Sequence, residues 1–175
     1  EVPGTRNILE ESARIARGEI LDLAEAPPSA FDALLMPGGF GVAKHHCGFA
    51  FRGAAAEVRP DVAAFIQAFL EAGKPVGALC IAPALVALVL KGLGRGGTLT
   101  LGNDEGCAAA VAALGSQHER HDRASEIAVD EALNLVTTPA YMFGEARLSE
   151  VWIGIERAVA EVLRRVRTPG GGGTD

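Results

Sequence analysis

The sequence predicts an α/β fold in which helices cover both faces of a mostly parallel sheet. Short runs of strand length alternate with longer segments of helical periodicity, and two of the runs are apolar throughout, which is typical of strands buried on both faces. A chain of 175 residues fits one domain with one hydrophobic core. We therefore expect a single domain over residues 1–168 and a disordered glycine-rich tail over residues 169–175.

The first part of the chain begins with a helical pattern. Apolar positions recur at helical spacing over residues 5–17, and Gly18 follows as a C-cap. Residues 19–23 are a short strand candidate. Residues 31–36 form an apolar run that ends in Pro37-Gly38-Gly39, which predicts a buried parallel strand followed by a tight loop.

The middle of the chain predicts a strand, a cysteine and a helix in succession. Residues 44–56 show no period and are expected to form a loop over the strand ends. A helix is predicted over residues 60–70, because Pro60 suits a first turn and apolar residues follow at helical spacing. Residues 75–79 then read as a buried strand, Cys80 lies at its end, and residues 81–91 resume a helical pattern.

The last part adds short strands and a long amphipathic helix. Strands are predicted over residues 98–101, 126–129 and 133–137, and a helix over residues 104–114 after a cap at Asn103 or Asp104. The final helix is predicted over residues 149–167. Its expected apolar stripe consists of Trp152, Ile155, Val159, Val162 and Val166.

Composition and charge exclude several classes of function. Sixteen basic and 22 acidic residues give a net charge of −6, which disfavours binding to nucleic acid or to anionic lipid. No apolar stretch is long enough to cross a bilayer, and the first six residues do not resemble the start of a signal peptide. Three widely spaced cysteines indicate a reducing compartment, so we expect a cytoplasmic protein.

The reactive site of such a sheet is expected at the carboxyl ends of its strands. Cys80 lies there, and the N–H groups and positive dipole end of the following helix lower the pKa of a thiol so placed. Packing as a small buried side chain is the alternative role for Cys80. Gly38 and Gly39 follow another strand and offer free N–H groups for an oxyanion, although an ordinary glycine-rich turn has the same sequence.

Other motifs are interpreted as structural. Residues 92–97 match GxGxxG, but they follow a helix and precede a strand, the reverse of a dinucleotide-binding loop. His45, His46 and Cys47 could join His118 and His121 around a metal, but adjacent side chains converge poorly, and we interpret these histidines as surface residues. Cys107 is interpreted as a packing residue, and Cys47 as a bystander or a redox partner near the site.

Six blocks of the sequence, in order along the chain, together resemble the ElbB family of glyoxalase-like proteins, in the PfpI and class I glutamine amidotransferase-like superfamily. These blocks are residues 5–7 (TRN), 12–20 (SARIARGEI), 37–44 (PGGFGVAK), 73–75 (GKP), 80–84 (CIAPA) and 136–142 (VTTPAYM).

The resemblance implies a flavodoxin-like three-layer sandwich with Cys80 on a nucleophile elbow. It implies a cofactor-independent, lyase-type activity that converts glyoxal to glycolate, with Gly38, Gly39, Ile81 and Thr138 binding the oxyanion or the substrate. The glutamate that contacts the nucleophile in this family lies on an N-terminal strand and loop with no counterpart here, so no general base is assigned. Glutamine hydrolysis is not expected, because no histidine follows His121.

The resemblance also implies a homodimer with neither metal nor cofactor, a small reactive carbonyl as substrate, and a link to isoprenoid production through the family's name. Two alternatives stay open. In one, the chain is a non-catalytic or redox-responsive protein that binds a partner and whose Cys80 is oxidised. In the other, the chain is a truncated product, whose lost strand would expose a sheet edge.

Overall fold

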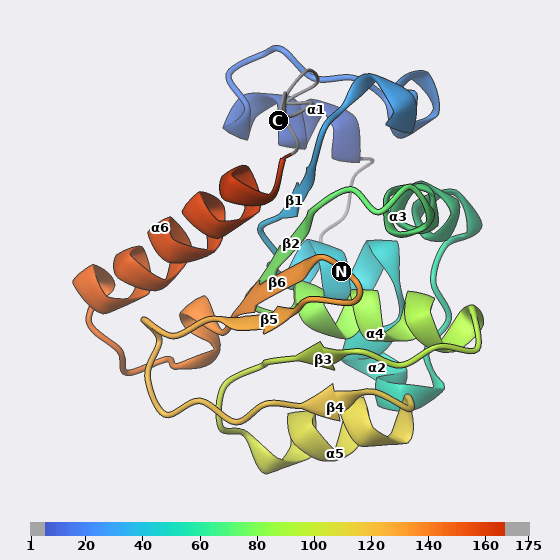
Figure 1. The fold of residues 1–175 in the computed structure, drawn as a ribbon. Helices are drawn as coiled ribbons and strands as arrows, with labels where there is room; N and C mark the ends of the chain where they lie inside the picture. Colours follow the sequence, from blue (N-terminus) through green and yellow to red (C-terminus); the bar gives the residue numbers. More distant parts are fainter. Residues whose placement is uncertain (1–5, 167–175) are drawn as a thin grey trace, which may run out of the picture.

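The computed structural model describes residues 6–166, and these residues form the α/β fold that the sequence predicts. Three parallel strands, β1 (Leu34–Met36), β2 (Val76–Leu79) and β6 (Leu135–Thr138), lie in the order β1-β2-β6. Antiparallel β5 (Ala128–Asp130) completes this sheet beside β6. A smaller parallel pair, β3 (Thr98–Leu99) and β4 (Gln117–His118), lies beside it (Figure 1).

Helices cover both faces of the main sheet, as expected of a flavodoxin-like sandwich. The long helix α6 (Leu148–Arg165) packs on β2 and β6 from one side. Helix α4 (Ala82–Gly92) packs on β2 from the other side, with α3 (Pro60–Glu71) next to it (Figure 1). Helix α5 (Glu105–Ala113) lies against the small β3-β4 pair. Three layers result, and they place the carboxyl ends of the parallel strands at one edge.

Helix α4 is at the centre of the core. Every residue from Ala82 to Leu90 is buried, because the sheet covers one side of the helix and other helices cover the rest. Phe69 and Ile66 of α3 add the largest side chains of this layer. A helix that is apolar all round is typical of such a buried position.

The sheet and α6 approach each other closely at two glycines. A Cβ at Gly77 of β2 would collide with Leu35 and would lie 2.9 Å from Val162 Cγ2. A Cβ at Gly154 of α6 would collide with the carbonyl oxygen of Ala124 and would lie 3.0 Å from Thr138 Oγ1. Glycine at these two positions therefore lets the helix lie directly on the sheet.

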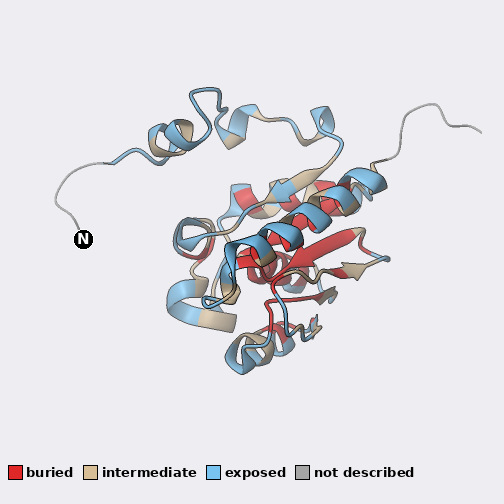
Figure 2. Cartoon of the chain, turned by 90° about the vertical axis from the view of Figure 1, so that its left-hand side faces the viewer, coloured by how far each residue is buried: buried red, intermediate tan, exposed pale blue. Residues whose placement is uncertain are grey.

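Residues 6–33 form an arm on the outside of the domain, and none of them is buried (Figure 2). The arm contains α1 (Ile8–Ile15). Asn7 caps the N-terminus of this helix, because its side-chain oxygen accepts hydrogen bonds from the N–H groups of Leu9 and Glu10. Lys74 holds the end of the arm, because its ammonium donates to the carbonyl oxygens of Pro28 (3.1 Å) and Phe31 (2.6 Å).

Several predicted elements differ from those observed. Residues 19–23 form no strand, because they lie on the exposed arm with no neighbouring strand to pair with. Residues 44–56 form mainly short helical turns and not an irregular loop. Strand β4 was not predicted, because a strand of two residues is too short to show a period. The short helical turns are η1 (Leu23–Glu25), η2 (Pro28–Ala30), η3 (Val42–His46), α2 (Phe49–Arg52), η4 (Gly53–Ala55) and η5 (Ala140–Met142).

The buried stripe of α6 differs in part from the predicted one. Val162 is buried and Ile155 and Val159 are half-buried, as expected, but Trp152 is 67% exposed. The other buried residues of the helix are Val151, Gly154 and Ala158. Close packing on the sheet selects small side chains, and a search for large apolar residues misses them. The tail predicted over residues 169–175 lies outside the described residues, and among residues 6–166 no helix is long and apolar enough to span a membrane.

Candidate active site

A cavity of about 960 Å³ opens at the carboxyl ends of β1 and β2. Three segments that are distant in sequence line it: residues 37–40 after β1, residues 79–81 after β2, and residues 140–142 after β6. Residues Phe49 and Ala50 of α2 and Ile155 and Val159 of α6 complete its walls. This is the edge of the sheet at which the sequence analysis placed the site, and Cys80 lies within it.

Cys80 occupies a sharp turn between β2 and α4. Its φ of +58° is in the left-handed region, which a non-glycine residue enters only at a conformational cost. The Cys80 N–H donates to the carbonyl oxygen of Thr138 (3.0 Å), and α4 begins two residues later. A strained strand-to-helix turn that carries a nucleophilic side chain is the geometry of a nucleophile elbow.

The glycine loop after β1 packs directly on this turn. A Cβ at Gly38 would lie 2.5 Å from the Leu79 carbonyl oxygen, 3.0 Å from Cys80 Cβ and 3.3 Å from the Ile81 nitrogen. Any side chain at Gly38 would therefore push the loop away from the elbow. Gly39 also has a positive φ of +90°, but a Cβ there would meet open space. Gly38, Gly39 and Ile81 thus lie together around Cys80, as the sequence analysis expected.

The N-terminal end of α4 gives the cavity a positive electrostatic potential. No side chain caps the N-terminus of this helix, and Pro83 in its first turn has no N–H. The remaining N–H groups and the helix dipole stabilise negative charge that is placed beside Cys80. No charged side chain lines the cavity among the described residues, and Tyr141 and Cys80 are its titratable groups.

Thr138 supports the elbow and does not line the cavity. It is fully buried, its hydroxyl donates to the Glu126 carbonyl oxygen (2.9 Å), and its own carbonyl accepts the Cys80 N–H. Its side chain is therefore already engaged away from the substrate space. Sequence analysis missed the apolar lining at Phe40, Phe49 and Tyr141. Phe40 and Tyr141 nevertheless lie in the blocks 37–44 and 136–142 that carry the family resemblance.

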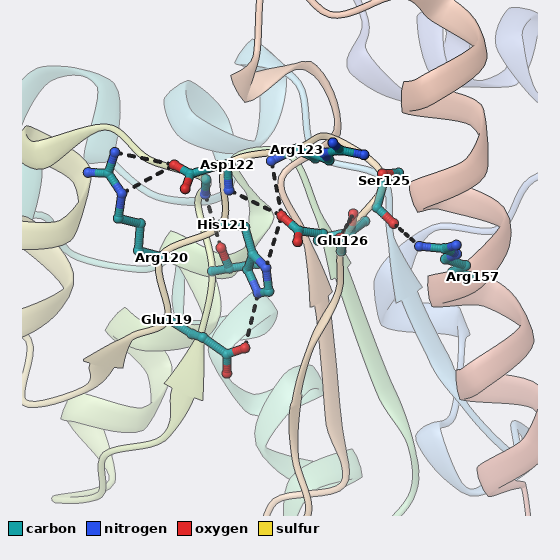
Figure 3. Close-up of polar contacts among 11 residues, drawn as sticks. Glu119, Arg120, His121, Asp122, Arg123, Ser125, Glu126 and Arg157 are labelled. Atoms are coloured by element: carbon teal, nitrogen blue, oxygen red, sulfur yellow. Dashed lines mark hydrogen bonds and ion pairs between the residues drawn. The ribbon is translucent and has the colours of Figure 1, made fainter.

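The histidines lie outside the cavity. His45 is exposed, as interpreted, whereas His46, His118 and His121 are half-buried, so the interpretation as surface residues is wrong for these three. The His121 side chain is 11% exposed and lies between Glu119 (3.1 Å) and Glu126 (3.5 Å) (Figure 3). Glu126 also accepts hydrogen bonds from the backbone N–H groups of Asp122 and Arg123. These contacts fix the conformation of the loop before β5. His118 is partly buried, and burial lowers its pKa.

The other two cysteines have higher pKa values than an ordinary thiol. Burial raises the pKa of Cys47, and burial with the nearby Asp104 carboxylate raises the pKa of Cys107 to about 11. Both thiols are therefore protonated at neutral pH. Cys47 packs in the main core and Cys107 against it. Within residues 6–166 no group of three or more histidine, cysteine, aspartate or glutamate side chains is arranged so that it could hold a metal ion.

Comparison with known proteins places the chain among longer relatives. It is 41% identical over 168 residues to the human glutamine amidotransferase-like class 1 domain-containing protein 3, mitochondrial, and 30% identical over 176 residues to the zebrafish (Danio rerio) ES1 protein, mitochondrial. These matches cover 91% of this chain but 60% and 63% of the relatives. The chain thus spans about three fifths of the curated relatives it matches. No family model matches it.

A solved structure agrees with both the fold and the sequence. The isoprenoid biosynthesis protein with amidotransferase-like domain from Ehrlichia chaffeensis superimposes with a TM-score of 0.84 and 31% identity, over 95% of this chain and 74% of that one. The names of the curated relatives contradict the cytoplasmic location predicted from the cysteines. They point to a mitochondrial location, which cysteine spacing does not distinguish from the cytoplasm.

Proposed function

Since the chain belongs to the class I glutamine amidotransferase-like proteins, we propose that it is a cysteine-dependent, glyoxalase-like enzyme that converts glyoxal to glycolate without a cofactor. The observation that carries this proposal is the position of Cys80. Its strained turn faces a cavity between a glycine loop and the N-terminus of a helix. These are the parts that covalent catalysis at a carbonyl requires.

The first chemical step is addition of the Cys80 thiolate to one aldehyde carbon. A carbon–sulfur bond forms, the carbonyl π electrons move to oxygen, and the product after protonation is a hemithioacetal. We assign the developing oxyanion to the N–H groups of Gly39 and Ile81, and the close packing of Gly38 against Leu79, Cys80 and the Ile81 nitrogen supports this assignment. Negative charge at this position is stabilised by the dipole of α4.

The second step is an internal oxidation and reduction between the two carbons. The carbon bonded to sulfur loses its proton to a base and the neighbouring carbon gains one through an enediolate, which leaves a thioester. Water then breaks the carbon–sulfur bond and releases glycolate and the thiol. Glyoxal and one water give glycolic acid, so no external oxidant is required.

The proton transfer requires a base, and no carboxylate or histidine among residues 6–166 lines the cavity. The ElbB resemblance assigns this role to a glutamate on a glycine-rich loop that this sequence does not include. We propose that a glutamate placed as in that family would supply that group. The name of the Ehrlichia protein supports a finer assignment of this chain to the ElbB-like members and to a role in isoprenoid production. We also propose that the chain forms a homodimer.

A second candidate function is redox sensing through Cys80. The described lining of the cavity favours it, because a thiol among apolar walls with no carboxylate or histidine beside it can still be oxidised to a sulfenic acid. This function needs a peroxide as oxidant and predicts selective modification of Cys80 without turnover. Mass spectrometry after mild peroxide treatment distinguishes it from catalysis.

The proposal is tested by glycolate production from glyoxal with the purified chain and with Cys80→Ala. We expect Cys80→Ala to fall to the uncatalysed rate, because the covalent step is lost, and Cys107→Ala to retain the activity of the parent chain. The same set is measured with the N-terminal segment of the relatives fused in front. Glycolate rates that are equal with and without Cys80, both in the parent chain and in the fused form, would contradict the proposal.

A further inference from the structure

We propose that this site selects aldehydes that carry an apolar group of about aromatic size, in preference to glyoxal itself. The inference deepens the proposed function and rests on it for the chemical step. It starts from the character of the cavity walls, which are built mainly from carbon. Phe40 and Leu35 lie on the side of β1, Phe49 and Ala50 on α2, and Met142 on η5.

The size of the cavity supports this preference. Glyoxal has only a few non-hydrogen atoms, whereas the space at Cys80 is about 960 Å³. A pocket of such a volume with mainly apolar walls is typical of sites for larger ligands. Glyoxal would leave most of the wall in contact with water, while a phenyl group attached to the same reacting carbons would cover part of it.

The distribution of charge disfavours anionic substituents. The described lining contains no arginine, lysine or histidine that could pair with a carboxylate. Lys44 is the nearby cation, but its ammonium lies over the ring of Phe40, 5.2 Å from the ring centroid. Burying an unpaired carboxylate against these walls would be unfavourable. The positive end of α4 is beside the reacting atoms, where the oxyanion forms, and not along the apolar wall.

Two exposed phenylalanines provide a matched pair of variants. Phe40 is 76% exposed and lines the cavity, whereas Phe51 is 73% exposed and does not line it. Replacement by serine removes a similar exposed ring in both cases. The two variants therefore share any general effect of losing surface aromatic area, and they differ in the wall of the site.

The catalytic test compares phenylglyoxal with glyoxal. Phenylglyoxal and one water give mandelate by the same steps, with the aldehyde carbon oxidised and the ketone carbon reduced. We expect kcat/KM for phenylglyoxal to exceed that for glyoxal by about tenfold or more, as is typical when an added apolar group fills a pocket. Phe40→Ser should raise KM for phenylglyoxal. Phe51→Ser should leave this KM unchanged. Mandelate is counted above the amount formed by Cys80→Ala, which corrects for uncatalysed rearrangement of phenylglyoxal.

A second readout does not depend on turnover. Cys80 is alkylated with iodoacetate, iodoacetamide and N-benzyl iodoacetamide, and each rate is divided by that of N-acetylcysteine. We expect the normalised rate to be highest for N-benzyl iodoacetamide, lower for iodoacetamide and lowest for iodoacetate. The advantage of the benzyl reagent should be reduced in Phe40→Ser and kept in Phe51→Ser.

The outcomes separate the two proposals. Glyoxal turnover without a phenylglyoxal advantage, together with equal normalised alkylation rates, would overturn the apolar preference and leave the glyoxalase proposal standing. No turnover with any substrate, together with the benzyl preference, would overturn the glyoxalase proposal and retain the apolar site. Faster reaction of Cys80 with iodoacetate than with the benzyl reagent would overturn the inference directly.

Discussion

His118 is a residue whose protonation the fold opposes. Its Nε2 atom accepts the backbone N–H of Leu101 (3.0 Å), so Nε2 carries no proton in this arrangement. Burial, as the largest cause, lowers its pKa below the ordinary value of 6.5. The unfolded chain therefore binds a proton at higher pH than the folded chain does. Stability from this group is present above about pH 6.5 and is lost as pH falls through the lower, folded pKa.

We predict that His118→Gln reduces the loss of stability as pH falls below about 6.5, because an amide oxygen can accept the same N–H without titrating. The measurement is urea unfolding at half-unit pH steps. His45→Gln is the control, since His45 is exposed. An unchanged pH slope in His118→Gln would show that this hydrogen bond contributes nothing to acid stability.

Residue by residue, the sequence predicted the position of the candidate nucleophile better than its surroundings. Cys80 could be found because a cysteine directly follows a buried strand and precedes a helix, which is a local pattern. Thr138 was expected at the substrate, but it holds the elbow through its carbonyl oxygen, a long-range contact that no local pattern contains. The burial of His121 depends likewise on Glu126 and the loop before β5.

Helix α6 shows how an element can be predicted while the face it buries is not. The helix lies where expected, at Leu148–Arg165, but its contact with the sheet runs through Gly154 and Ala158. Hydrophobic periodicity gives weight to large residues such as Trp152, which here faces solvent. The identity of the contact face is decided by the backbone distance between helix and sheet, which is a tertiary property.

The close approach at Gly154 leads to a prediction at the scale of this element. Gly154→Ala should destabilise the protein by about 1–3 kcal/mol, because its Cβ would collide with the Ala124 carbonyl and overpacking outweighs the gain in helix propensity of about 1 kcal/mol. Gly92→Ala is the matched control. A Cβ there meets open space at the end of α4, and we expect it to be neutral or slightly stabilising.

The measurement is the free energy of unfolding in urea for both variants. Equal stability of Gly154→Ala and the parent chain would mean that α6 can move away from β6 at no cost. The packing described for this interface would then be wrong.

The molecule as a whole consists of a buried sandwich and an outer arm. None of the residues 6–33 is buried, and α1 presents Ile15 with 88% of its surface exposed. A segment with so little buried surface opens at low free energy, independently of the core. Lys74 holds only the end of the arm, next to β1.

We therefore predict that limited trypsin digestion cuts first after Arg14 or Arg17, both on the arm, and leaves a fragment that retains the core. Arg165 provides the internal comparison, because its side chain is 8% exposed and pairs with Glu131 and Glu161. Mass spectrometry identifies the cuts, and the thermal midpoint of the trimmed protein should stay within a few degrees. Cleavage of the whole chain with no stable fragment would contradict this division.

The arrangement of the three parallel strands has a consequence for folding kinetics. β2, which ends at Cys80, pairs with β1 about 40 residues earlier and with β6 about 60 residues later. Parallel pairing over such separations forms slowly, because the chain loses loop entropy before the contacts stabilise it. The left-handed turn at Cys80 depends on neighbours from both strands, Gly38 and Thr138. The turn that positions Cys80 is thus complete only when both pairings have formed, and a partly folded chain lacks the candidate site.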